Sequence, residues 1–134
     1  MMGLNLSEVK PLNREVHGHE INAFNRAHIS IRADQPGNGG ASHVYNIAIL
    51  TEQTGQSAAH IQFQDGPVRE AGPNGISDEA LLAILIDRLQ GFQRGQYSCR
   101  ENALVLTKLE EAMHWLQHRT QQREARGVEG TSTV

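Results

Sequence analysis

The sequence contains few residues of several chemically informative types. It has one cysteine, Cys99, so no disulfide can form within the chain, and this fits a reducing compartment. Aromatic residues make up only 4% of the chain, which leaves few rings for stacking. Lysine and arginine number 12 against 15 aspartates and glutamates, a net charge of -3. Broad electrostatic binding to a nucleic acid polymer is therefore not expected.

Long hydrophobic runs are also missing. No stretch approaches the roughly 20 consecutive apolar residues that span a bilayer, and no signal-peptide core precedes the first charges. We therefore expect a soluble, intracellular protein with no membrane partner. With 134 residues, the chain has the size of one domain with its own core, and we expect a single domain over 1–134.

The known patterns of phosphate loops and metal sites are incomplete. The glycine-rich stretch 37–40 is followed by neither Lys-Ser/Thr nor a helix, so it predicts an ordinary hairpin turn. His114 and His118 are one helical turn apart, but no glutamate stands beside the first of them as in zinc proteases. His17 and His19 belong to no further ligand cluster. We interpret these as solvated surface histidines and expect no metal and no cofactor.

Catalytic chemistry has equally little support. Cys99 stands near the start of a predicted helix, where the pKa of a thiol can fall, but no histidine is near it in sequence. No nucleophile and base are paired elsewhere. We therefore expect a protein that is not an enzyme.

The most informative stretch is 77–127, which predicts two helices joined by a short turn. Ser77 is a typical N-cap, and acidic residues follow it, where the helix dipole favours them. The first helix carries an apolar stripe at helical spacing, formed by Leu81, Leu85, Leu89 and Phe92. Ser98 and Glu101 form a capping box that predicts the start of the second helix.

The second helix has its own apolar face and a basic end. Its face consists of Ala103, Leu106, Leu109, Met113 and Leu116, and Gly127 is expected to end it. The short turn makes the helices antiparallel neighbours. The run 80–86 is apolar all round, and Leu104 and Trp115 also need cover. Since large apolar patches rarely stay exposed on monomers, we expect a homo-oligomer.

The residues before 77 predict a small antiparallel sheet. Segments 28–32 and 59–64 alternate polar and apolar residues, and 43–50 is the third expected strand, all separated by short turns. The fold is therefore α+β, with an N-terminal antiparallel sheet of about three strands packed on a C-terminal two-helix hairpin. Residues 1–76 form a lead-in, the sheet and a Gly/Pro-rich loop, and 128–134 form a tail.

The turn of the hairpin gathers groups suited to a phosphorylated nucleoside. Arg88 and Phe92 share one helix face, Arg94 and Arg100 flank the turn, and Asn102 lies in the first turn of the second helix. A ring can stack on a base, an amide can bind its polar edge, and guanidinium groups can neutralise phosphate. In the plainer alternative, Phe92 packs the turn and Asn102 caps the backbone.

A second basic group lies near the end of the second helix. Arg119, Arg123 and Arg126 form one stripe, whose plainer role is to complement the helix dipole. At 1.5 Å per residue, Asn102 and Arg119 are roughly 25 Å apart. Within one chain they cannot hold the same small ligand. Either there are two sites, or a second antiparallel chain completes one site.

Several short segments of the sequence resemble the phage Thoeris anti-defence proteins of the first type. They lie between Ile61 and Thr131, about half of the chain, and read FQDGPVREAGPNG, RLQGFQ, YSCREN, TKLEEA, WLQHRT and RGVEGTS. The resemblance implies a non-enzymatic sponge for cyclic ADP-ribose isomers made by bacterial TIR proteins. It also implies a hairpin similar to that of anti-CBASS sponges, and a dimer or a hexamer acting in the cytoplasm of the infected host.

The resemblance also implies site residues. The ADP-ribose site would use Phe92 and Asn102, and a separate pocket for cyclic di- or trinucleotides would use Arg119, Thr120 and Arg123. To the first site we add Arg88 and Arg100, from their spacing at the turn. The alternatives are a hydrolase that destroys the signal and a small phage regulatory protein.

Overall fold

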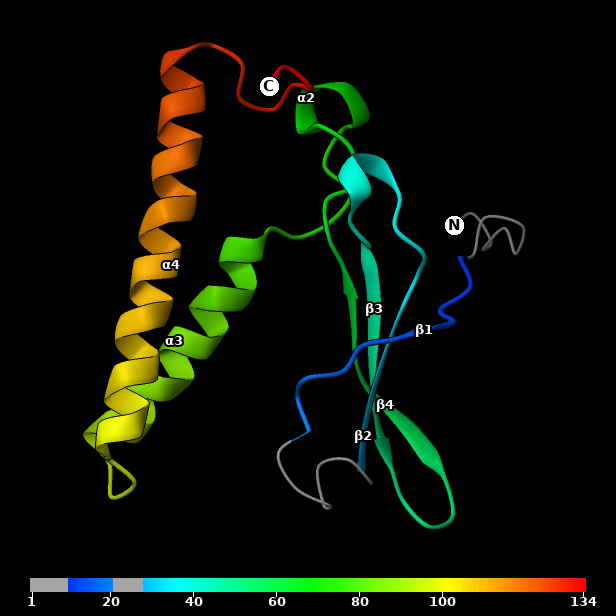
Figure 1. Ribbon diagram of the computed structural model, residues 1–134, viewed down its shortest axis with the longest axis vertical. Coiled ribbons are helices and arrows are strands. Elements are labelled where there is room, and N and C mark those ends of the chain that lie inside the picture. Colours follow the sequence, from blue (N-terminus) through cyan, green and yellow to red (C-terminus); the bar gives the residue numbers. More distant parts are fainter. Residues whose placement is uncertain (1–9, 21–27) are drawn as a thin grey trace. The chain divides into compact units, whose positions relative to one another are not determined.

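The structure is a computed structural model that describes residues 10–20 and 28–134 (Figure 1). The chain divides into two compact units, Met1–Asp65 and Gly66–Val134. The first contains an antiparallel sheet and the second contains the long helices, which confirms the α+β class. Residues 1–9 of the expected lead-in lie outside the described part. The single domain, and the packing of the sheet on the hairpin, stay predictions.

Among the described residues, the first unit has a sheet of four strands, one more than predicted. They are β1 (Arg14–Glu15), β2 (Ile29–Ala33), β3 (Val44–Leu50) and β4 (Gly55–Gln62), paired antiparallel in that order. β2 and β3 coincide with two of the predicted strands to within one residue at each end. The additional strand, β1, has two residues. A strand so short carries no alternation that a sequence pattern could detect.

β4 begins four residues before the predicted start at Ala59, because a bulge interrupts its pattern. Ile47 pairs with Ala59, whereas Ala48 pairs with Ser57, so Ala58 is an extra residue on β4. Alternation along the strand is broken at that point. The turn before β4 is correspondingly shorter than the predicted 51–56. It is closed by the Thr54 amide, which donates to the Thr51 hydroxyl at 3.0 Å.

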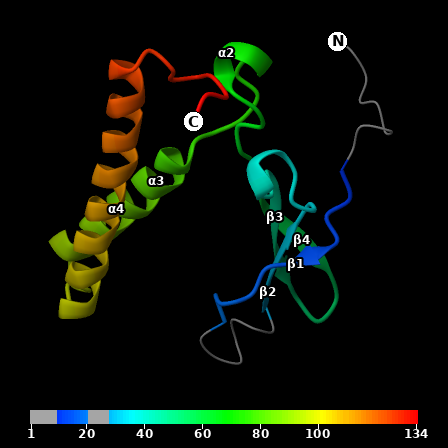
Figure 2. The ribbon, with the colours of Figure 1, turned by 45° about the horizontal axis from the view of Figure 1, so that its top comes forward.

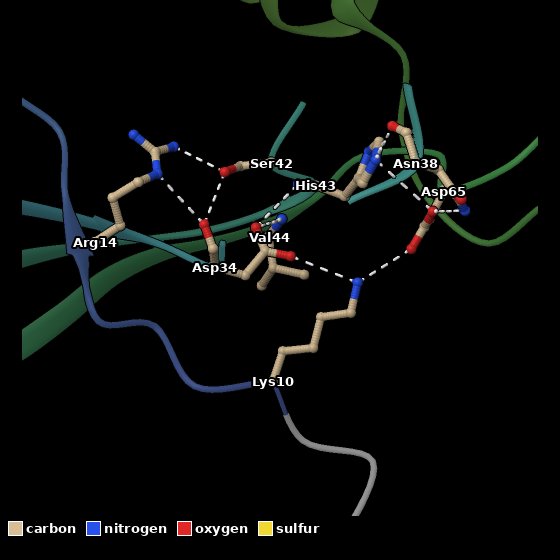
Figure 3. A network of polar contacts seen from close by, with 8 residues as sticks. All are labelled: Lys10, Arg14, Asp34, Asn38, Ser42, His43, Val44 and Asp65. Carbon is tan, nitrogen blue, oxygen red and sulfur yellow. Dashed lines mark hydrogen bonds and ion pairs between the residues drawn. The ribbon is translucent and has the colours of Figure 1, made fainter. Parts of the chain in front are cut away.

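The glycine-rich segment between β2 and β3 is a hairpin connection, as predicted, with a short 3-10 turn at Asn38–Gly40. Asp34 organises it from the buried side (Figure 3). Its carboxylate accepts from the backbone amides of His43 at 3.0 Å and Val44 at 3.2 Å. The Ser42 hydroxyl donates to the Asp34 backbone oxygen at 2.7 Å. Polar contacts within the chain thus account for the conformation of this loop.

Lys10 links this loop to the end of the first unit. Its ammonium lies 3.5 Å from Asp34 Oδ2 and 3.2 Å from Asp65 Oδ2, as Figure 3 shows. Burial by itself would raise the pKa of Asp34. The two backbone amides and the Lys10 ammonium outweigh it, so the pKa of Asp34 lies below its ordinary value. The Asn38 amide and Lys10 lower the pKa of Asp65 in the same way.

The second unit consists of α2 (Val68–Ala71), α3 (Asp78–Arg94) and α4 (Arg100–Ala125). The predicted cap of α3 is confirmed, because the Ser77 hydroxyl accepts from the Ala80 amide at 3.2 Å. α2 has only four residues and lies in the segment predicted as a loop. It is too short to show a helical period, and Pro67 and Gly72 bound it.

α4 begins one residue later than its predicted capping box. The N-cap is Cys99, whose sulfur accepts from the Asn102 amide at 3.4 Å. The box of Ser98 and Glu101 is therefore wrong. Ser98 still belongs to the turn, because its amide donates to the Gly95 oxygen at 3.3 Å.

The predicted end of α4 at Gly127 is confirmed. Gly127 has a φ of 73°, and its amide donates to the Glu124 oxygen at 3.0 Å. The Val128 amide donates to the Arg123 oxygen, also at 3.0 Å. Together these bonds form a Schellman cap, which needs a left-handed residue such as glycine after the helix.

α3 and α4 contact each other and cross at an open angle (Figures 1 and 2). In α4 the predicted stripe from Leu106 to Leu116 is half-buried, whereas Leu85 of the α3 stripe is 46% exposed and Ile86 is half-buried instead. A run that is apolar all round has no unique inner face, so spacing could not choose between them. Neither helix contains a fully buried residue. No helix in the described ranges is long and apolar enough to cross a membrane.

Candidate functional site

A stacked pair of side chains lies at the turn end of α3. The Arg88 guanidinium carbon is 4.9 Å from the centre of the Phe92 ring, which confirms that the two share one helix face. The ring of Tyr97 meets Phe92 edge to face, with 6.3 Å between ring centres. Tyr97 is 66% exposed, and the sequence analysis did not include it among the site residues. The turn thus presents two adjacent rings and a guanidinium.

Gln93 fixes the path of the turn. Its amide nitrogen donates to the backbone oxygen of Cys99, and its side-chain oxygen accepts from the Cys99 amide, both at 3.1 Å. One carboxamide therefore satisfies both backbone groups of the residue that caps α4. Gln93 was not among the residues predicted for the site. The glycines at 91 and 95 around it were the available signal, because a chain that turns there needs a partner for its freed backbone groups.

Asn102 follows this cap directly. Its side-chain nitrogen donates to the backbone oxygen of Tyr97 at 3.5 Å, the outer limit of a hydrogen bond. The side-chain amide therefore loses only a weak hydrogen bond if it turns to a ligand. Arg100 is the first residue of α4 and is exposed. Both therefore lie at the N-terminus of a helix of 26 residues, where backbone amides and the dipole favour an anion.

The second basic group lies at the far end of the same unbroken helix. Arg119 is exposed and Thr120 is half-buried. Because α4 is continuous from Arg100 to Ala125, the separation of roughly 25 Å between Asn102 and Arg119 holds along its axis. The structure therefore brings together Arg88, Phe92 and Asn102 with the turn, and keeps the second group apart from them within one chain.

Arg123, which was predicted to belong to the second pocket, is enclosed by the segment after α4. Its side chain is 11% exposed, and Nε lies 3.0 Å from the Glu129 carboxylate. The remaining guanidinium nitrogens donate to backbone oxygens of the segment after α4. The reason is the Schellman cap, which turns the chain back toward the last helical turns.

Comparison with known proteins identifies the hairpin. A model of the "Acb2/Tad1, hairpin domain" family matches residues 55–121, half of the chain. The chain belongs to the Acb2/Tad1 hairpin-domain family. Together with the phage relative described next, this match confirms the resemblance to Thoeris anti-defence proteins. The matched segment of this Acb2/Tad1 hairpin protein contains the turn site, Arg119 and Thr120, and ends before Arg123.

One curated relative of this hairpin protein is "Thoeris anti-defense 1" of Bacillus phage SBSphiJ7. The two chains are 58% identical over 73 residues, which is 54% of this chain. The match covers 51% of the relative, so the likeness spans about half of that protein's length.

His114 and His118 lie side by side on α4. The rings of His114 and His118 are stacked 6.2 Å apart, and Trp115 meets both edge to face. His17 is 68% exposed as predicted, but His19 is 23% exposed and lies 3.0 Å from Glu20, so it is not a freely solvated residue. Within residues 10–20 and 28–134, no three potential ligands gather for a metal ion. Independence from metal stays a prediction.

Proposed function

We propose that this protein is a sponge for immune signalling nucleotides of the cyclic ADP-ribose type, including glycocyclic ADP-ribose. It binds the signal and withholds it from the effector, and so blocks bacterial anti-phage defence in the cytoplasm of the infected host. Membership of the Acb2/Tad1 family and the name of the phage relative support this role. The bound molecule leaves unchanged, because sequestration requires affinity and not chemistry.

The stacked Arg88 and Phe92 beside the N-terminus of α4 carry this proposal. In it, the adenine of the ligand stacks on the Phe92 ring and the Asn102 amide binds a polar edge. Arg88, Arg100 and the backbone amides of α4 neutralise the pyrophosphate. The turn is well suited to this task because Gln93 holds it in shape before the ligand arrives, which lowers the ordering cost of binding.

A second site for cyclic di- or trinucleotides is proposed at Arg119, Thr120 and Arg123. The support is the basic stripe at the far end of α4, about 25 Å from the turn, which is too far for one small ligand. The two sites are therefore expected to be filled independently.

Sequestration requires tight binding. Nanomolar affinity corresponds to about -12 kcal/mol, more than an exposed turn on one chain is expected to supply. We therefore propose that a second copy encloses the ligand, in a dimer or in a hexamer built from dimers. The exposed apolar side chains of the hairpin support such an assembly.

Release of the ligand separates a sponge from a hydrolase. The purified protein is incubated with glycocyclic ADP-ribose, filtered free of unbound ligand and heated, and the supernatant is examined by mass spectrometry. We expect one intact ligand mass after any incubation time. A ring-opened product whose amount grows with time would establish a hydrolase. No bound nucleotide at all would point to the third alternative, a regulatory protein.

A further inference from the structure

The segment after α4 occupies arginine side chains that the proposed second site requires. Arg123 Nη1 donates to the Thr133 oxygen at 2.8 Å, and its Nη2 donates to the Val128 and Thr131 oxygens at 3.0 Å each. Arg126 Nη2 donates to the Val134 oxygen at 2.6 Å. All four acceptors are backbone carbonyls of the tail, residues 128–134.

The tail is held from its other side by α2. Glu70 Oε1 accepts from the amide of Ser132 at 3.2 Å and from its hydroxyl at 3.1 Å. The Arg69 amide donates to the Gly130 oxygen at 2.8 Å. In both views the tail runs from the end of α4 to α2 (Figures 1 and 2). It is therefore a docked element with defined partners on two sides.

The tail contacts imitate those of an anionic ligand. A guanidinium has five N–H donors. On Arg123, three backbone carbonyl oxygens accept from N–H groups that could otherwise donate to phosphate oxygens. The fourth partner of Arg123 is a carboxylate, that of Glu129 at 3.0 Å. Because the Arg123 side chain is only 11% exposed, a phosphate cannot reach it while the tail is docked.

The tail also sets the charge of the adjoining pocket. A pocket of about 500 Å³ is lined by Val68, Arg69, Glu124, Gly127, Glu129 and Gly130. With the tail docked, one arginine faces two glutamates. Displacing the tail removes Glu129 and Gly130 from this lining and frees Arg123 near Glu124, which leaves two arginines against one glutamate. The surface uncovered in this way is more favourable for an anion than the pocket was.

We propose that the tail is an autoinhibitory competitor of the second site, and that a phosphodiester ligand binds there by displacing it. This inference rests on the proposed function for its ligand. Arg123, Arg126 and the tail follow the segment that the family model matches, whereas Arg69 and Glu70 lie within it.

Removing the tail tests the inference. The deletion of 129–134 keeps Val128, whose amide completes the helix cap. Calorimetry compares the full chain and the deletion with a cyclic dinucleotide, with inorganic pyrophosphate and with cyclic ADP-ribose. A tail that leaves the site open for 1–10% of the time weakens binding about ten- to a hundredfold. We expect the deletion to tighten cyclic dinucleotide and pyrophosphate binding by that factor, and to leave cyclic ADP-ribose binding at the turn unchanged.

A point substitution provides an independent variant. In G130A, the new Cβ would lie 2.8 Å from the Arg69 side chain at a φ of +78°, so the tail should detach. G39A is the matched control, because Gly39 has a φ of +73° but open space around its Cβ position, far from the tail in sequence. G130A should reproduce the deletion, and G39A should bind as the full chain does.

The outcomes separate the two proposals. Equal cyclic dinucleotide affinity of the full chain and the deletion overturns the tail inference and leaves the second site standing. If neither form binds the cyclic dinucleotide, the proposal of a second site for such ligands is wrong. Pyrophosphate then decides the inference alone: tighter binding by the deletion and by G130A supports competition for the arginines, and equal binding overturns it.

Discussion

The Gln93 carboxamide pairs with both backbone groups of Cys99, at 3.1 Å each. Gln93 belongs to the last turn of α3, and Cys99 is the N-cap of α4, so this one side chain joins the end of one helix to the start of the next. The rings of Phe92 and Tyr97 lie on the turn that it closes. The geometry of the proposed ligand site therefore depends on a residue that need not touch the ligand.

Q93A should loosen the turn. It removes two hydrogen bonds and leaves the amide and oxygen of Cys99 to water, at a cost of about 1–3 kcal/mol in the free energy of unfolding. Thermal unfolding and calorimetry with cyclic ADP-ribose measure both effects. Q90A, an exposed glutamine of the same helix, is the control and should change neither. Unchanged ligand affinity in a folded Q93A would show that the turn geometry is not part of the site.

Two pairs of substitutions should affect different ligands. F92A removes a stacking surface worth roughly 1–3 kcal/mol, and N102A leaves polar ligand atoms unpaired at a comparable cost. Together they should abolish tight binding of cyclic ADP-ribose and spare a cyclic dinucleotide. R119A with R123A should do the opposite. If each pair weakened both ligands equally, one composite site across two chains would be the better account.

R123A needs separate treatment. The Arg123 guanidinium contacts four tail residues. R123A should therefore release the tail as well as remove a ligand contact. Arg119 is exposed, so R119A changes only the second site. The separation of the two sites should therefore be judged on R119A.

Cys99 should be replaceable by serine without a loss of stability. Its sulfur accepts from the Asn102 amide at 3.4 Å, and a hydroxyl is the better N-cap acceptor. C99S should keep or raise the melting temperature, whereas C99A should lower the free energy of unfolding by about 0.5–2 kcal/mol. Differential scanning calorimetry distinguishes the three proteins. A C99A variant as stable as the wild type would mean that the sulfur contributes nothing to the cap.

The sequence was most informative where a signal is local. Ser77 begins a helix because its side chain caps a backbone amide, and Gly127 ends one because it lacks a side chain and can take a positive φ. Both effects act within a few residues. Spacing likewise brought Arg88 to the face of Phe92. The capping box failed because Ser98 and Cys99 are adjacent candidates, and the choice between them is made by Gln93, six residues before Cys99.

The features that sequence reasoning missed depend on residues distant in the chain. The docking of the tail joins Ser132 to Glu70, 62 positions apart, and no periodic pattern reports such a contact. β1 is defined by its pairing with β2 and not by its composition. In physical terms, caps and helix faces are determined by neighbours in sequence. The environment of Arg123 is instead determined by the path of the segment after α4, which folds back onto the helix end.

The first unit should lose stability in acid. The pKa of Asp34 is lowered by folding, so its contribution is fully present above the unfolded value near 4 and is lost as the pH falls below it toward the folded value. Asp65 acts in the same direction. Amide exchange of Val44, followed by NMR between pH 7 and pH 3, should report earlier opening of the sheet in acid. In D34N this pH dependence should be weaker, whereas D87N, on exposed α3, should retain it.

The hairpin should associate with further copies of the chain through its exposed apolar face. Ile84 is 63% exposed, Trp115 is 59% exposed, and Leu85, Leu104 and Val105 each expose nearly half of their surface. A patch of this kind rarely stays open to water on a monomer, and a buried tryptophan is a frequent energetic centre of an interface. Sedimentation at micromolar concentration should therefore give a dimer or a hexamer.

W115E should weaken the assembly by about 2 kcal/mol or more, a thirtyfold rise in the dissociation constant. Q117E adds the same charge at an exposed polar position two residues away and should leave the mass unchanged. A wild-type protein that sediments as a monomer would remove the assembly. It would also remove the enclosure on which nanomolar sequestration depends, since the turn of a single chain leaves one side of the ligand in water.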